Sequence, residues 1–203
     1  MPESTVALST PTLRSRYEPA KSVPGEVGIW VFILGDMALF GAFFGVFVYD
    51  RSTRVATFAW SQAELHLSFG AINTCLLLTG SLFVVWAVQA AGRGANFVAR
   101  RFIALAMICG SIFLIDKVIE YSEKLSHGFT PNTNLYFTYY YMFTGIHAIH
   151  LIIGLITLGH IRKLLRKPEL SAVNYRTINV VACYWHLVDL LWVVLFALLY
   201  LMA

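Results

Sequence analysis

Apolar residues occur in five long runs that short polar segments separate. The runs cover residues 27–49, 68–91, 102–119, 136–160 and 180–202. Each is close to the ~20 residues that a helix needs to cross the hydrocarbon core of a bilayer. The runs are continuous and do not alternate with a period of two, which excludes a transmembrane β-barrel. The pattern predicts an all-α integral membrane protein, a bundle of five transmembrane helices.

Composition supports this class. Of the 203 residues, 58% are hydrophobic and 13% are charged, and a soluble domain of this size could not cover so much apolar surface. We interpret residues 1–24 as a flexible cytoplasmic tail, because they lack the apolar core of a signal peptide. Residues 25–203 are then one transmembrane domain. Tyrosines near helix ends, Tyr140 and Tyr200 among them, are expected in the interfacial aromatic belts.

Basic residues predict the orientation of the bundle. Three lie in the N-terminal tail, three in the second loop and five in the fourth loop, which five spans place on one side of the membrane. The opposite side carries only Arg51, Arg54 and Lys124. The positive-inside rule therefore predicts a cytoplasmic N-terminus and an outside C-terminus. This topology explains the net charge of +4, so no nucleic-acid partner is expected.

Ionisable side chains recur inside the apolar runs. Asp36 is about ten residues into the first run, or ~15 Å deep at 1.5 Å per residue. His147 and His150 in the fourth run are three residues apart, as are His186 and Asp189 in the fifth, so each pair shares a helix face. Ionisable groups at membrane depth are costly, which makes them candidates for a functional site.

Asn73 brings the second run into this polar layer, and Glu120 lies at the boundary of the third run. Three interpretations stay open: an interhelical hydrogen-bond network, a metal or haem site, and a proton or ion path. Composition favours the network. Di-iron bundles carry a Glu three residues before a His, and no Glu in this sequence has that spacing. We therefore expect no catalytic, cofactor-binding or metal-binding residue. The absence of an internal repeat disfavours a small transporter.

Two segments carry the ionisable pairs in a distinctive context: Tyr-Trp-His-Leu-Val-Asp-Leu-Leu-Trp at residues 184–192 and Thr-Gly-Ile-His-Ala-Ile-His at residues 144–150. The first resembles the last helix of the cytochrome c oxidase subunit III family, and the second resembles the helix before it. Asn73-Thr74 and Glu120-Tyr121 resemble two further family motifs. The resemblance extends from about residue 26 to the end of the chain, with the motifs in the family's order.

The resemblance implies a non-catalytic subunit III of a haem–copper terminal oxidase in the electron transport chain of a bacterial inner membrane. Such a subunit lies beside catalytic subunit I, binds phospholipid in a V-shaped cleft and supports proton supply. Haem and copper would belong to partner subunits, and this chain would hold neither. Its length resembles that of the short five-helix bacterial form.

One departure from the family concerns its embedded acidic site. Asp36 stands where many members have Glu, in a Gly35-Asp36-Met37 segment that resembles a branch associated with nitric oxide reductases. An accessory subunit of a nitric oxide reductase complex is therefore the alternative function. We expect Asp36 to be the acidic site and the other polar residues to form the interhelical network. Candidates for binding lipid headgroups are Arg100, Arg101, Arg162 and Lys163.

Overall fold

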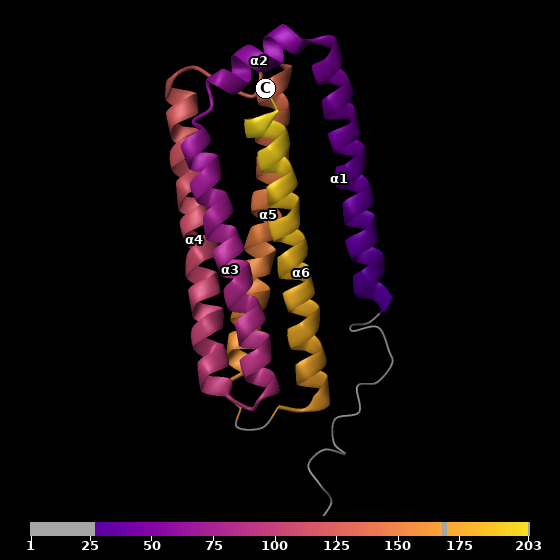
Figure 1. Cartoon of the computed structure of the whole chain (residues 1–203), viewed down its shortest axis with the longest axis vertical. Coiled ribbons are helices and arrows are strands. Elements are labelled where there is room, and N and C mark those ends of the chain that lie inside the picture. Colours follow the sequence, from indigo (N-terminus) through magenta and orange to yellow (C-terminus); the bar gives the residue numbers. More distant parts are fainter. Residues whose placement is uncertain (1–26, 168–169, 203) are drawn as a thin grey trace, which may run out of the picture.

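A computed structural model of the chain describes residues 27–167 and 170–202; the predicted tail lies outside them. The described elements are α1 (Val27–Thr53), α2 (Val55–Ala63), α3 (Leu67–Gly92), α4 (Asn96–Ser126), α5 (Leu135–Leu164), α6 (Ala172–Phe196) and a π-helical turn, η2 (Ala197–Leu201). Five helices are long and apolar enough to cross a membrane, and Figure 1 shows them side by side. The prediction of a five-helix membrane bundle is confirmed.

The long helices extend beyond the apolar runs that predicted them. The run at 102–119, for example, lies inside α4, which covers Asn96–Ser126. Its additional turns carry polar residues such as Arg100 and Lys124. A helix satisfies its own backbone hydrogen bonds, so it continues into the headgroup region without a penalty.

A short helix, α2, had no signal in the sequence, because its nine residues are too few to form a membrane span. It crosses the end of the bundle near the C-terminus, between α1 and α3 (Figure 1). Phe58 anchors it, with ring centroids 5.4 Å from Phe47 of α1 and 5.7 Å from Tyr136 of α5. Asn134 adds a hydrogen bond of 2.7 Å to Ser61 Oγ.

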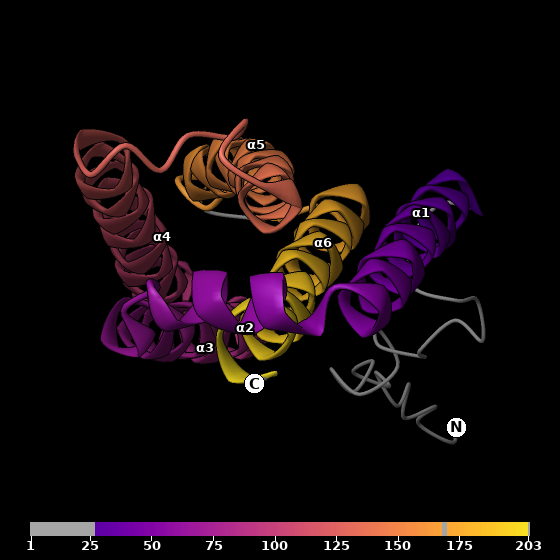
Figure 2. The same cartoon turned by 90° about the horizontal axis from the view of Figure 1, so that it is seen from above.

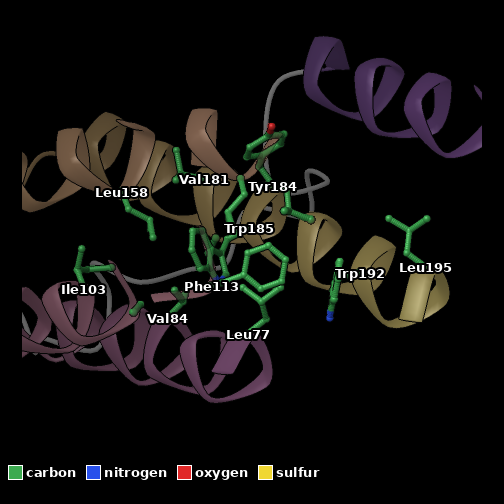
Figure 3. Packing of buried hydrophobic residues seen from close by; sticks show 14 of the residues in the cluster. Leu77, Val84, Ile103, Phe113, Leu158, Val181, Tyr184, Trp185, Trp192 and Leu195 are labelled. Carbon is green, nitrogen blue, oxygen red and sulfur yellow. The ribbon is translucent and has the colours of Figure 1, made fainter. Parts of the chain in front are cut away.

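Trp185 of α6 occupies the centre of the bundle and is fully buried. Its indole fills space left by glycines on three neighbouring helices, which are Gly80, Gly110 and Gly154. Figure 3 shows Trp185 among the buried side chains that α6 packs against its neighbours. Small residues at such positions let membrane helices approach closely, and here they admit one large ring.

α1 lies at the edge of the bundle, beside α6 and away from α3 and α4 (Figures 1 and 2). Its buried residues are Ile33, Phe40 and Phe47, all on one side of the helix. Phe40 packs in a small separate cluster with Leu187 and Leu191 of α6. The remaining sides of α1 are exposed in the isolated chain and would contact lipid or other subunits.

Candidate functional site

Asp36 of α1 pairs with His150 of α5 inside the membrane span. Asp36 Oδ1 lies 3.2 Å from His150 Nε2, and the two side chains are only 8% and 16% exposed. The hydroxyl of Tyr184 on α6 donates a hydrogen bond of 3.1 Å to the carbonyl of His150. The pair thus joins the peripheral helix α1 to the α5–α6 part of the bundle.

The contacts of His150 suit a proton placed between the two side chains. His150 Nδ1 lies 2.9 Å from the carbonyl oxygen of Ile146, and since a carbonyl only accepts, the contact requires Nδ1 as the donor. Nε2 then faces Asp36 Oδ1, and one proton between them could lie on either the acid or the imidazole. In both of these forms the pair would have no net charge, which is the less costly arrangement for ionisable groups in hydrocarbon.

A second cluster lies towards the end of the bundle that α2 crosses. Lys117 Nζ on α4 donates to Glu120 Oε2 at 2.5 Å and to the hydroxyl of Tyr200 at 2.9 Å. The Tyr200 hydroxyl donates to Glu120 Oε1 at 2.6 Å. The Lys117 ammonium also faces the rings of Tyr140 and Trp192, at 5.6 and 4.8 Å from their centroids. This cluster is a closed, buried ion pair that ties η2 to α4.

Asn73 and Thr74 of α3 face two different helices. Asn73 Nδ2 donates to Asp116 Oδ2 on α4 at 2.6 Å. The indole Nε1 of Trp192 on α6 donates to Thr74 Oγ1 at 3.1 Å. The Asn-Thr pair therefore connects α3 to both neighbours through side chains.

His186 of α6 makes a further interhelical contact, at 2.6 Å between its Nδ1 and the Oγ of Ser81 on α3. Asp189, one turn further along, is 4% exposed, and neither carboxyl oxygen has a hydrogen bond with the described residues. His147 is fully buried against the rings of Phe113 and Trp192, and its ring nitrogens likewise lack described partners.

The six predicted network residues therefore lie in several separate clusters. Four of them bond across helices, namely Asn73, Glu120, His150 and His186. Among the described residues, no group of three His, Cys, Asp or Glu side chains could hold a metal ion. The partners Ser81, Tyr184 and Tyr200 were not predicted, because a hydroxyl in an apolar run has no distinguishing spacing.

Two tyrosines assigned to the aromatic belts are buried instead. Tyr140 is fully buried and Tyr200 is 7% exposed. Their positions near helix ends suggested interfacial residues, but Tyr200 donates to Glu120 and Tyr140 faces Lys117. The buried ion pair draws both rings inward.

The predicted headgroup residues lie at the opposite end of the bundle. Arg162 and Lys163 are exposed in the last turn of α5. The Arg101 guanidinium lies 4.4 Å from the centroid of the Phe97 ring. Arg100 is half-buried, and its Nε has no hydrogen bond with the described residues.

Comparison with known proteins agrees with the motifs. The family model described as cytochrome c oxidase subunit III matches residues 11–203. A cytochrome c oxidase subunit 3 of Corynebacterium diphtheriae is 28% identical over 201 residues, which are 98% of this chain and 93% of that protein. One of Synechocystis is 30% identical over 210 residues, covering 99% of this chain and 88% of that protein.

A longer relative is also similar. The heme-copper oxidase subunit I+III of Aeropyrum pernix is 28% identical over 179 residues, which are 85% of this chain and 22% of that protein. These oxidase names do not favour the nitric oxide reductase alternative. From the family match over nearly its whole length and the five-helix membrane fold, we conclude that this chain belongs to the cytochrome c oxidase subunit III family and is a multi-pass subunit III of a haem–copper oxidase.

Proposed function

We propose that the Asp36–His150 pair is a protonatable site through which this subunit supports proton supply to catalytic subunit I in a bacterial inner membrane. The observation that carries the proposal is the contact of 3.2 Å between Asp36 Oδ1 and His150 Nε2 inside the membrane span. A carboxyl and an imidazole in contact at membrane depth offer two places for a proton, which a fully apolar site does not.

The location of the pair supports this role. Asp36 lies on α1, which is at the edge of the bundle (Figure 2). Asp36 Oδ2 is buried without a hydrogen bond to the described residues, so this oxygen can accept one more donor. The position of α1 at the periphery leaves room for subunit I or lipid on its outer sides.

Labelling with a hydrophobic carbodiimide tests the proposal, because the reagent needs a protonated carboxyl inside the membrane. The purified oxidase complex should be labelled at Asp36, and Asp36→Asn should abolish that label. Glu123→Gln is the matched control, since Glu123 pairs with His66 near the surface and its loss should leave labelling unchanged. Absence of Asp36 labelling in the intact complex would contradict a protonatable carboxyl.

Turnover provides the functional readout. Asp36→Asn should lower the sustained oxygen-consumption rate of the complex, and Asp36→Glu should restore it. Equal sustained rates for all three proteins would overturn the role in proton supply while leaving the family assignment intact. Supplying nitric oxide in place of oxygen to the same preparation tests the alternative acceptor.

We further propose that phospholipids bind at the basic end of the bundle, on Arg100, Arg101, Arg162 and Lys163. This proposal is supported by the cluster of positive charge at this end of the bundle, where anionic headgroups would lie under the predicted topology. Neutralising these residues should reduce the phospholipid that copurifies with the complex.

A further inference from the structure

Tyr184 of α6 lies beside the Asp36–His150 pair and contacts both helices that carry it. The Tyr184 hydroxyl donates a hydrogen bond of 3.1 Å to the carbonyl oxygen of His150 on α5. Its ring centroid lies 6.2 Å from that of Phe32 on α1, and Phe32 is one helical turn before Asp36. Because Tyr184 is only 6% exposed, a tyrosine hydroxyl is enclosed next to the pair.

Gly154 allows the Tyr184 ring to approach α5. A Cβ at Gly154 would lie 3.8 Å from Tyr184 Cε1, and Gly154 is one turn beyond His150, on the same side of α5. Trp185, the next residue of α6, packs against the same glycine, with its Cε3 3.2 Å from that Cβ position. Packing on α5 therefore holds the Tyr184 ring with its hydroxyl at His150.

The present partner of the Tyr184 hydroxyl can be given up at little cost. A carbonyl inside an α-helix, such as that of His150, already accepts the N–H of the residue four positions later. Loss of the tyrosine donor would not leave this carbonyl unpaired. A carboxylate is a stronger acceptor than a carbonyl, because hydrogen bonds to ionised groups are about twice as strong as those between neutral groups.

Asp36 offers such an acceptor. Its Oδ1 contacts His150 Nε2, while its Oδ2 is buried and has no hydrogen bond with the described residues. The charge of Asp36 acts on Tyr184, so the two groups lie within electrostatic range of each other. An ionised Asp36 would need a donor at Oδ2, since an unpaired carboxylate oxygen away from water is costly.

We infer that Tyr184 is a positioning residue for the Asp36–His150 pair, and that its hydroxyl changes partner from the His150 carbonyl to Asp36 Oδ2 when Asp36 is ionised. The added donor stabilises the ionised carboxyl and thereby helps to set the pH at which the site releases its proton. This inference rests on the proposed function, because it concerns the same protonatable site.

Further titratable side chains near the pair are His147 on α5 and Cys183 on α6. His147 precedes His150 by three residues and interacts with it electrostatically. Cys183 packs against the cluster that contains Phe40 of α1, whose ring faces that of His150. Both side chains stay in place when the Tyr184 hydroxyl alone is removed, so the experiment below reports on that hydroxyl.

Labelling of Asp36 by a hydrophobic carbodiimide, followed against pH in the purified complex, tests this role. The reagent needs the protonated carboxyl, so labelling declines where the site loses its proton. Tyr184→Phe keeps the ring and removes the donor. Its labelling midpoint should lie about one pH unit above that of the wild type, the size expected from a hydrogen bond to a charged group. Incorporation of 3-fluorotyrosine at position 184, a stronger donor, should move the midpoint to lower pH.

Tyr141→Phe is the matched control. The Tyr141 hydroxyl also donates to a backbone carbonyl, that of Phe129, at 2.8 Å, and Tyr141 lies nine residues before His150, or ~14 Å along α5. Its labelling midpoint should equal that of the wild type.

An unchanged midpoint in Tyr184→Phe, even with a lower Tm, would mean a merely structural role and would overturn the inference. The proposed function would then stand, because Asp36 would still be labelled. An equal shift in Tyr141→Phe would overturn the inference as well. No labelling of Asp36 at any pH would instead refute the proposed function, and this inference with it.

Discussion

The indole of Trp185 lies against the backbone of Gly110, so closely that a Cβ at this glycine would be 2.9 Å from Trp185 Cη2. The ring is fully buried, and Gly80 and Gly154 border it from two other helices. A rigid ring enclosed by three helices cannot move aside. The spacing of α3, α4 and α5 around α6 therefore depends on this contact.

Gly110→Ala should destabilise the bundle. The extra methyl requires a shift of Trp185 or of the α4 backbone, and such overpacking costs about 1–3 kcal/mol. This exceeds the ~1 kcal/mol that alanine gains over glycine in a helix. Thermal unfolding of the purified protein in mild detergent should show a lower Tm.

Gly159→Ala is the control, because a Cβ there would meet only Met107 Cε at 3.8 Å. This variant should unfold at or above the wild-type Tm. If Gly110→Ala matched it, the close packing of Trp185 would not contribute to stability.

Lys117→Met should strongly destabilise the end of the bundle that α2 crosses. Glu120 would keep Tyr200 as a donor but lose its counter-charge in a fully buried position, and breaking a buried pair typically costs about 3–5 kcal/mol. Adding Glu120→Gln removes the stranded charge and should recover most of that loss. Stability in the double variant as low as in Lys117→Met would argue against an ion pair.

His186→Ala should weaken the contact between α3 and α6 without changing metal content. The bond between His186 Nδ1 and Ser81 Oγ is 2.6 Å long, and a net hydrogen bond contributes about 1 kcal/mol. A double-mutant cycle with Ser81→Ala should give a coupling of that size. Loss of metal from the His186→Ala complex, at unchanged subunit composition, would point instead to a metal ligand.

Labelling of single cysteines tests the predicted orientation. With Cys75, Cys109 and Cys183 replaced by alanine, Ser126→Cys should react with a membrane-impermeant maleimide from outside the cell. Arg166→Cys should react only in inverted vesicles, because the positive-inside rule places it in the cytoplasm. The reverse pattern would invert the assigned topology.

The sequence by itself determined the class of this protein and its number of membrane spans. Continuous apolar runs of about 20 residues have one structural solution in a bilayer, since each helix satisfies its own backbone. The His and Asp residues in those runs also identified the family through their motifs. The helices end beyond the apolar runs, because a helix continues into the headgroup region. There the hydropathy of the residues no longer marks where the helix ends.

Only the tertiary structure decided which polar side chains meet. Spacing placed His147 and His150 on one face, yet His150 bonds with Asp36 while His147 packs against Phe113 and Trp192. Rotation of each helix about its axis selects these partners, and it depends on packing such as that of Trp185 among the glycines. Hydropathy carries no information about that rotation when nearly every side of a helix is apolar.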